Sequence, residues 1–450
     1  MKKLGGGSET EIVVIGGGLA GLAAAATAEQ AGATTVVLEA APEPGGLARS
    51  FHVDGYTFDC SGHLLHLARP ETESLVYSVT SKDDWVELER CSSIVIRNRL
   101  VPYPFQLHLA HAPEDIRDEC LSELPKRSPD LGDDPAELGF DEWINASLGT
   151  GIGRHFMIPY NEKVSQAKVS DLTCEWLGRF VPKPSLDDIR SGASSKRQVE
   201  TGYNAHFLYP RAGGIQALWR GLAARVADVR TGTRVVEIDT DRCVVRVASG
   251  EKFAYSEGVI SSSKLPAMTR LVQPVPSTQA LAGLLRGSTI TCVNVGVRNL
   301  SSRFADLTWL YLPESRFRAY RIGFYNRFSA EMSPPGGEGL YVEIAHGPGV
   351  SEQALIDAAV ADLVELGAIE SDEDVEVAAP VRLNDAYVVH DRNCSWARGR
   401  ILDDLSRRGI RMVGRYGNWE YAAMEDALWQ GIAAANELTG SASKRIELTS

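Results

Sequence analysis

The sequence predicts an α/β fold in which a parallel-sheet domain is interleaved with a helical insert and a mainly antiparallel sheet. Near the start, a short apolar strand at 12–15 leads through glycines into an alanine-rich helix and a second strand at 35–38. A strand followed by a helix returns at 411–437. Between these ends, helical periodicity gives way to alternating strands, so both ends are expected to build one domain around the middle.

Composition limits the classes of function. The chain has 450 residues, 44% of them hydrophobic and 23% charged, which is typical of a globular protein. Its net charge of −13 opposes broad binding to nucleic acid or anionic membranes. The seven cysteines show no zinc-type spacing, so we expect no metal site and a reducing, cytoplasmic setting. No segment resembles the run of about 20 apolar residues that spans a bilayer.

The glycines at the first turn have the spacing of a dinucleotide site. Gly16 allows a tight turn, Gly18 lets the backbone approach a pyrophosphate, and Gly21 lets the helix lie close to the strand. Glu39 ends the next strand, where a carboxylate can accept hydrogen bonds from a ribose and disfavours a 2′-phosphate. These features together predict a bound dinucleotide.

Two further segments indicate that the dinucleotide is FAD. The glycine pair 45–46, with Arg49 close behind, suits contact with a dinucleotide already held by the first turn. Near the other end, Gly414 and Arg415 follow an apolar strand and precede a helix. An arginine at such a turn can pair with a pyrophosphate, and the helix N-terminus can direct amides at a flavin edge.

We therefore predict a Rossmann-like FAD-binding domain made of three separated segments. The helical stretches broken by prolines form a mostly helical substrate or insert region, and the short aromatic and arginine-rich strands form an antiparallel-sheet substrate region. The predicted FAD-binding parts are 9–90, 201–285 and 376–440, the helical region is 91–200, and the sheet region is 286–375.

The segment PEPGGLARSFHVDGYTFDCSGH resembles the flavoprotein group of amine oxidases, protoporphyrinogen oxidase, carotenoid desaturases and UDP-galactopyranose mutase. The stretch GRYGNWEYAAME is similar to the closing segment of the mutases. The resemblance implies a flavin pyrophosphate contact for Arg415, a substrate-side role for Tyr421, and a place along the flavin for Met424 and Glu425. The mutases usually have aspartate where Glu425 stands, whereas amine oxidases typically show glycine–glutamate where this chain has glycine–arginine.

Three segments of the middle also resemble the mutases. PYNEKVSQAKVSDL carries Tyr160 and Lys163 as substrate-binding residues, but Ser165 stands where the family has a tryptophan near the uracil, so a base other than uracil stays open. RAYRI resembles a segment that offers Arg321 as a diphosphate ligand. NDAYVVHD resembles the strand with another substrate tyrosine, here Tyr387. The second cation on the diphosphate is expected to be Arg179 or Lys183.

His63 and His66 stand in TFDCSGHLLHL, after the second glycine pair. The resemblance places the loop of Gly62 and His63 against the flavin near N5, where His63 senses its redox state, and leaves His66 in the packing. Plain core packing stays open for both histidines. A zinc site needs further ligands that the spacing does not offer.

The resemblance implies an FAD-dependent nucleotide-sugar enzyme that interconverts pyranose and furanose forms. In such an enzyme reduced flavin N5 attacks the anomeric carbon and expels the nucleoside diphosphate, and the ring opens through an iminium and recloses. The alternative is an FAD-dependent oxidoreductase of the amine oxidase or desaturase type, and a third hypothesis is a flavoprotein without turnover. The expected partners are a nucleoside-diphosphate sugar and an external electron donor. The expected catalytic residues are His63, Arg321, Tyr387 and Tyr421.

Overall fold

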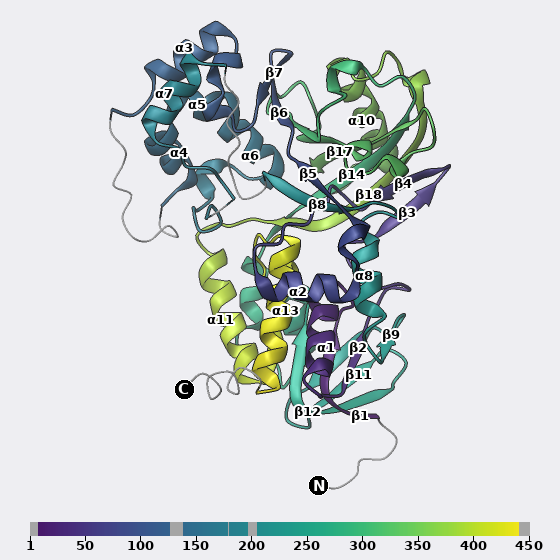
Figure 1. Cartoon of the computed structure of the whole chain (residues 1–450). Helices are drawn as coiled ribbons and strands as arrows, with labels where there is room; N and C mark the ends of the chain where they lie inside the picture. Colours follow the sequence, from purple (N-terminus) through teal and green to yellow (C-terminus); the bar gives the residue numbers. More distant parts are fainter. Residues whose placement is uncertain (1–7, 127–137, 179, 197–204, 441–450) are drawn as a thin grey trace.

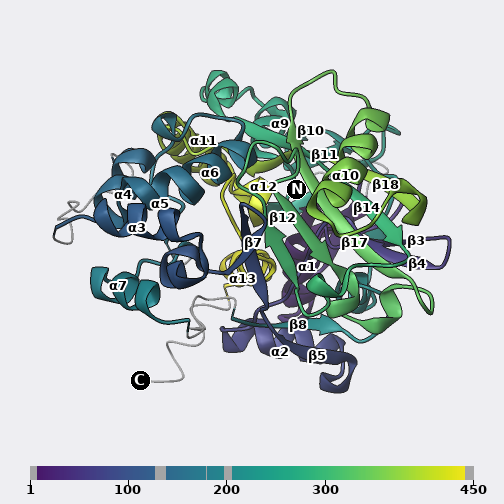
Figure 2. The same ribbon diagram turned by 90° about the horizontal axis from the view of Figure 1, so that it is seen from above.

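The computed structural model describes residues 8–126, 138–178, 180–196 and 205–440. The lower part of the molecule in Figure 1 contains the first helix and the last helix, purple and yellow. The upper part divides into a helical insert on one side and a second sheet on the other. Seen from above, the short helix α12 (Gly414–Gly417) and α13 (Met424–Leu438) lie between these two units (Figure 2).

The first sheet holds the glycine turn at the end of a central strand. β1 (Ser8–Ile15) pairs in parallel with β2 (Thr35–Leu38) and β12 (Lys252–Ser261). β19 (Ile410–Met412) pairs in parallel with β12, so the chain's last strand joins the sheet of its first. Continuous apolar runs such as residues 12–15 of β1 are typical of parallel strands covered on both faces. The sheet also contains β9 (Val229–Arg230), β10 (Val235–Asp239), β11 (Val244–Val247) and β13 (Val272–Gln273).

The first and last helices pack together very closely. α1 (Leu19–Gln30) is buried along most of its length, and α13 lies beside it in both views (Figures 1 and 2). A Cβ on Gly431 would lie 2.2 Å from the Ala20 carbonyl oxygen, and a Cβ on Gly21 would lie 1.9 Å from that of Gly16. Real Cβ atoms are not found so close to a backbone oxygen, so these two glycines set the spacing of α1 against its neighbours.

The second sheet is mainly antiparallel, as predicted, with one parallel pair. Its order is β18 (Val375–Val388), β14 (Gly287–Val297), β17 (Glu338–His346), β16 (Arg321–Phe324), β15 (Trp309–Tyr311), β6 (Ser92–Ile96) and β7 (Arg99–Pro102). β15 runs parallel to β6. The helix α10 (Glu352–Leu366) covers one face (Figure 1).

This sheet corrects two predicted boundaries. β6 and β7 come from the region 91–200, which we predicted to be mostly helical, and β18 comes from 376–440, which we assigned to the FAD-binding domain. β18 pairs along most of its length with β14, so it belongs to the second sheet. Strand pairing of this kind joins segments far apart in the sequence, and local periodicity does not reveal it.

The helical insert has its own apolar core, which includes Phe140, Trp143 and Ile144. A π-helical turn, Gly153–Met157, runs directly into α6. Residues 127–137 of the predicted loop SELPKRSPDLGDDP lie outside the described part of the chain. The insert's helices are α3 (Glu114–Ser122), α4 (Phe140–Leu148), α5 (Thr150–Ile152), α6 (Ile158–Ser165) and α7 (Leu186–Ser194).

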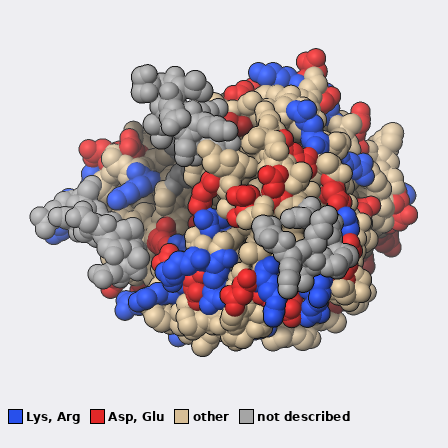
Figure 3. All heavy atoms as spheres, turned by 90° about the horizontal axis from the view of Figure 1, so that it is seen from below, with Lys and Arg blue, Asp and Glu red and all other residues tan. Residues whose placement is uncertain are grey.

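The remaining elements join these units. Two small antiparallel pairs consist of β3 (Ser50–Val53) with β4 (Tyr56–Asp59) and β5 (Trp85–Glu89) with β8 (His206–Pro210). The helices are α2 (Pro70–Val79), α8 (Gln216–Ala223), α9 (Leu265–Leu271) and α11 (Cys394–Arg407). In the described ranges, no helix has the length and apolarity to cross a membrane. The face seen from below carries charges of both signs, intermixed (Figure 3).

Asp59, at the end of β4, anchors the segment that leads to His63. Its Oδ1 accepts hydrogen bonds from the Ser50 hydroxyl (2.5 Å) and the Ile215 amide (3.2 Å), and its Oδ2 accepts one from the Tyr209 hydroxyl (2.7 Å). Burial raises the pKa of Asp59 from 3.8 to about 6, and these hydrogen bonds offset only part of the shift. The folded state therefore binds this proton more tightly than the unfolded state.

We expect Asp59→Asn to remove a pH dependence of stability. The wild-type contribution is present below pH 4 and is lost as the pH rises through 6, a change of about 3 kcal/mol. Because the Tyr209 hydroxyl can rotate to accept from the new amide, the variant should still fold. Urea unfolding at pH 4.5, 6 and 7.5 measures the effect as the difference between the two proteins. A difference that is constant across this range contradicts the prediction.

Candidate active site

A cavity of about 1140 Å³ lies where the first sheet, the helical insert and the second sheet meet. It exceeds the range of about 300–1,000 Å³ that is usual for small-molecule pockets. Its wall runs from the first glycine turn, past Arg415, to the aromatic side chains of the insert. The carboxyl ends of β1 and β2 open into it, which is where open α/β sheets bind ligands.

The two predicted glycine turns lie against each other in this cavity. The Gly45 amide donates a hydrogen bond to the Gly17 carbonyl (2.7 Å), and Gly18 and Gly45 form an isolated bridge. Gly16, with φ +100°, has no room for a Cβ, because that atom would lie 2.3 Å from the Ser262 hydroxyl. The exposed backbone between the turns forms the kind of cradle that phosphates occupy at a helix N-terminus.

Glu39 and Arg49 stand at opposite sides of this cradle. Oε2 of Glu39 accepts from the Gly17 amide and Oε1 from the Ala41 amide, both at 2.7 Å. The carboxylate is therefore fixed at the end of β2, beside the cavity. Arg49 donates from Nε to the Gly46 carbonyl (2.9 Å) and also lines the cavity. Gly21 does not line it and acts through packing, as described above.

Arg415 presents unsatisfied donors to the cavity. Its Nε and Nη2 are buried and have no hydrogen-bond partner among the described residues. Its Cζ lies 4.8 Å from the ring centre of Tyr387 and 4.9 Å from that of Tyr421, and the two rings stack at 5.9 Å. Leaving such donors unpaired is costly, so an anionic ligand is expected to complete them. The glycine cradle and this arginine together fit a dinucleotide with a pyrophosphate.

His63 is a neutral imidazole beside the same cavity. Burial is the main cause that lowers its pKa to about 4, and the nearby Arg415 and Arg321 act in the same direction. Its Nδ1 lies 3.0 Å from the Ser61 carbonyl, which can only accept, so Nδ1 carries the proton. Nε2 is then an acceptor. His66 also lines the cavity and packs edge-on against Phe207 at 6.3 Å.

Arg321, which we predicted to be a diphosphate ligand, lines the cavity and is bound to a carboxylate. Its Nε and Nη2 donate to the two carboxylate oxygens of Glu343, at 2.6 and 2.8 Å. Burial alone would raise the pKa of Glu343, but Arg321 outweighs it and the pKa is lowered. Glu343 also accepts from the Ser61 hydroxyl. The sequence analysis missed Glu343, although an acid inside the apolar strand YVEIAH signals a buried ion pair.

Aromatic side chains form the wall opposite the first sheet. Tyr160 packs against Phe156 at 5.6 Å and edge-on against Tyr311 at 5.3 Å, while Tyr103 lies 5.1 Å from Tyr311. Of these four, only Tyr160 was predicted. Ser165 also lines the wall, with its hydroxyl donating to the Asn161 carbonyl (2.7 Å). Ser165 is thus a small side chain in this wall, and its hydroxyl already has a partner.

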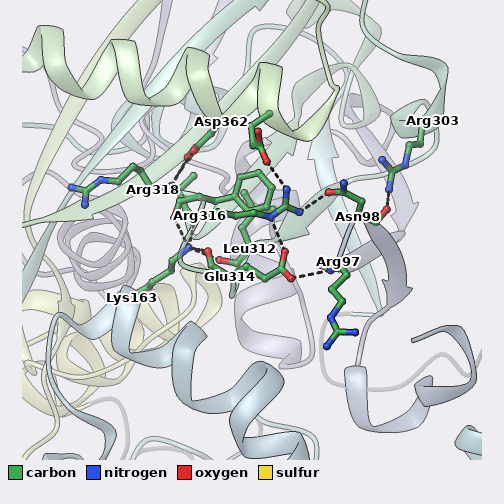
Figure 4. Close-up of polar contacts among 12 residues, drawn as sticks. Arg97, Asn98, Lys163, Arg303, Leu312, Glu314, Arg316, Arg318 and Asp362 are labelled. Carbon is green, nitrogen blue, oxygen red and sulfur yellow. Dashed lines mark hydrogen bonds and ion pairs between the residues drawn. The ribbon is translucent and has the colours of Figure 1, made fainter. Parts of the chain in front are cut away.

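Lys163 does not reach the cavity and is not positioned as the substrate ligand we predicted. Figure 4 shows its Nζ directed at the loop between β15 and β16. Nζ donates to four carbonyl oxygens at 2.7–3.1 Å, those of Leu312, Glu314, Phe317 and Ala319. Lys163 therefore ties α6 to the second sheet. Arg179 lies outside the described residues, and Lys183 is exposed and does not line the cavity.

We expect Lys163→Met to destabilise the protein by about 2–3 kcal/mol, because a charged donor is lost and buried carbonyls are left unpaired. Thermal and urea unfolding of the FAD-loaded protein should show the loss. Lys168→Met is the matched control, since Lys168 is an exposed lysine five residues further along, and it should change stability by less than about 0.5 kcal/mol. Equal stabilities of the two variants would show that the carbonyl contacts contribute little.

Glu425 also differs from its predicted place along the flavin. It is 1% exposed, and its Oε1 accepts from the amides of Ala68 and Arg69 and from the Thr72 hydroxyl. It therefore holds the start of α2 against α13. The neighbouring Met424 does line the cavity. The remaining predicted residues that line it are Gly16, Gly18, Gly46, Gly62, Gly414, Tyr387 and Tyr421.

Comparison with known proteins agrees with this geometry. A model of the family of flavin-containing amine oxidoreductases matches residues 19–439. The crystal structure of a reduced UDP-galactopyranose mutase is similar at a TM-score of 0.90 and 26% identity, covering 96% of each chain. A structure from Exiguobacterium that is named for protoporphyrinogen oxidase has a TM-score of 0.74 at 16% identity, covering 97% of this chain and all of that one. Wild-type putrescine oxidase bound to putrescine has a TM-score of 0.65 at 15% identity, with the same coverage.

Proposed function

Since the chain belongs to the family of flavin-containing amine oxidoreductases, it is a flavin enzyme that uses FAD, and we propose a reaction for it. We propose that it interconverts the pyranose and furanose forms of a nucleotide-linked sugar. The similarity to reduced UDP-galactopyranose mutase over 96% of both chains carries this proposal. Arg321, Tyr387 and Tyr421 support it, because they line the same cavity and give it hydrogen-bond donors besides the residues of the glycine cradle.

Each part of the cavity has a task in the proposed reaction. When bound and reduced, FAD supplies the nucleophilic nitrogen of this chemistry. The glycine cradle, Glu39 and Arg49 hold the cofactor, and Arg415 offers its free N–H groups to the pyrophosphate of that cofactor. Tyr387 and Tyr421 bound the same space with hydroxyls that can hydrogen-bond the substrate. These contacts keep the leaving nucleoside diphosphate close enough to be recaptured.

Two residues define the electrostatics around the sugar. His63 stays neutral near pH 7, and its Nε2 can accept a hydrogen bond without adding positive charge beside the flavin. Arg321 keeps Nη1 outside its two hydrogen bonds to Glu343, and can donate it to a phosphate oxygen. Because Glu343 neutralises much of its charge, Arg321 is expected to hold the diphosphate of the substrate mainly through this N–H group.

The aromatic wall bears on the base of the nucleotide. Tyr103, Phe156, Tyr160 and Tyr311 offer flat apolar surfaces, and Ser165 leaves room next to them. A planar base can bind by stacking on such a surface. The space at Ser165 means that bases larger than uracil belong in any substrate panel.

Oxidation of an amine or of a carbon–carbon bond is the second candidate, because the family model that matches the chain is that of the amine oxidoreductases. The two reactions differ in electron balance. Isomerisation leaves the flavin reduced after each turnover, whereas oxidation consumes dioxygen or another acceptor.

One anaerobic experiment distinguishes them. FAD-loaded protein is incubated with UDP-galactopyranose and with ADP-, GDP- and CDP-linked hexoses, before and after reduction by dithionite, and the products are separated by chromatography. The proposal predicts a furanose product only after reduction, with the flavin absorbance unchanged by substrate. Bleaching of the oxidised flavin by putrescine or another amine under the same anaerobic conditions, together with no isomer from any nucleotide sugar, would replace it with the oxidase.

A further inference from the structure

The wall of the cavity contains a histidine to which the proposed reaction assigns no role. His390 follows the end of β18, is 5% exposed, and is one of the residues that line the cavity. Neither of its ring nitrogens has a hydrogen-bond partner among the described residues. Leu172, Trp176 and Tyr421 line the same cavity.

The backbone of His390 is held firmly. Its carbonyl accepts from the Thr173 amide (2.8 Å) and from the Thr173 hydroxyl (3.2 Å). The next residue, Asp391, forms a bridge with Leu172 and caps the start of α11 with its carboxylate. The ring is therefore presented from a fixed point, and its lack of partners is not a result of a loosely placed chain.

A charged cluster lies behind the ring, on the side of Nδ1. Oε2 of Glu175 is 3.8 Å from Nδ1, too far for a hydrogen bond but close enough to attract its proton. Glu175 is paired with Arg398 at 2.5 Å and accepts from the Ser395 hydroxyl. The contacts with His390 and Ser395 and the charge of Arg398 lower the pKa of Glu175 to about 2, so it is a carboxylate. It favours the tautomer with the proton on Nδ1, which makes Nε2 an acceptor on the opposite edge.

A buried imidazole without partners is unfavourable unless a ligand or water completes it. Simple packing does not account for His390, because a phenylalanine would fill the same space without burying two ring nitrogens that lack hydrogen-bond partners. The ion pair behind it instead resembles the arrangement of a histidine oriented by an acid.

We propose that His390 is a substrate-binding residue whose Nε2 hydrogen-bonds an oxygen-bearing group of the ligand, and that Glu175 is the positioning residue that orients the ring. This inference rests on the proposed function, since it requires a hydroxyl- and phosphate-rich ligand in the cavity. The oxygen can belong to a sugar hydroxyl or to a phosphate, and binding measurements separate the two.

The test compares His390→Phe and His390→Gln with wild type, all loaded with FAD and reduced under nitrogen. Calorimetry measures the Kd of UDP-galactopyranose and of UDP. We expect His390→Phe to raise the Kd of the nucleotide sugar about 10-fold, and His390→Gln, whose amide can take the place of Nε2, to recover part of it. If only UDP-galactopyranose loses affinity, the bonded oxygen belongs to a sugar hydroxyl. If UDP loses affinity by the same factor, the bonded oxygen belongs to a phosphate.

The role of Glu175 has its own readout. Glu175→Gln should raise the same Kd by a smaller factor, and that increase should vanish in the His390→Phe background. An effect of Glu175→Gln that persists without the imidazole would instead mark a general structural role. The flavin absorbance and the thermal unfolding temperature of each variant verify that the cavity is intact.

The outcomes separate the two proposals. If wild type binds UDP-galactopyranose and both His390 variants bind it equally well, the assignment of His390 is overturned and the proposed function stands. If wild type binds none of the UDP-, ADP-, GDP- and CDP-linked hexoses, both are overturned.

Discussion

Replacing Arg415 by methionine is expected to weaken FAD binding by about 10- to 150-fold, because a charged hydrogen bond to an anion contributes about 1.5–3 kcal/mol. The stability of the apoprotein should not fall, since Nε and Nη2 of Arg415 are buried without partners before the anion binds. Weaker ligand binding without a loss of apoprotein stability is characteristic of a residue whose buried charge is paired only when the ligand is bound. Fluorescence titration with FAD and urea unfolding of the apoprotein measure the two quantities.

The control is Arg411→Met on the neighbouring strand β19. Arg411 pairs with Glu437 at 2.7 Å and does not line the cavity, so its loss should leave the Kd of FAD unchanged. An Arg415 variant that binds FAD normally but no longer binds UDP would move this residue from the cofactor to the substrate.

Alanine substitutions at two helix glycines are expected to change the free energy of unfolding in opposite directions. Gly431→Ala should destabilise the protein by about 2–3 kcal/mol, because its Cβ meets the Ala20 carbonyl at 2.2 Å and has to push α13 away from α1. Gly399→Ala, in the middle of α11, should stabilise it by about 0.5–1 kcal/mol, since the site is exposed and a Cβ there meets nothing within 4 Å.

Both glycine variants are compared with wild type by urea unfolding and FAD titration. Because α1 begins at the glycine cradle, Gly431→Ala should also lower FAD affinity, whereas Gly399→Ala should leave it unchanged. If both substitutions change the free energy of unfolding in the same direction, the helices α1 and α13 can move apart at little energetic cost.

The dinucleotide part of the site could be predicted from the sequence because its signals are local. The glycines at 16, 18 and 21 and the acid at 39 lie within one strand–turn–helix–strand unit, and their spacing reflects contacts inside that unit. The return of the chain near Gly414 was predictable for the same reason. A motif fixes which backbone atoms lie near the ligand when all of its residues belong to one short segment.

The side-chain partners were harder to predict. Lys163 and Glu425 stand in segments that resemble the mutases, yet each is bonded to the backbone of another element, Lys163 to the loop before β16 and Glu425 to the start of α2. The sequence shows the residue type, but it does not show which backbone group of another segment will be its hydrogen-bond partner. Arg321 lines the cavity, but its partner Glu343 could be identified only from the register of β16 against β17.

The extent of the second sheet was missed for a related reason. β6 and β7 lie in a region rich in helices, and β15, the strand that joins β6 to the rest of the sheet, is more than two hundred residues away in the chain. Pairing at such separation depends on how the whole chain is arranged, so a boundary drawn from local pattern falls in the wrong place.

The first helix and the last helix of this chain complete each other, and this bears on how the protein is made. On the ribosome, the glycine cradle emerges early, whereas β19, which pairs with β12, and α13, which packs against α1, emerge much later. The nascent chain has then released nearly every other element before its cofactor domain can close. Capture of FAD is therefore expected to follow synthesis, and a messenger truncated before codon 410 should yield a polypeptide that chaperones retain and proteases degrade.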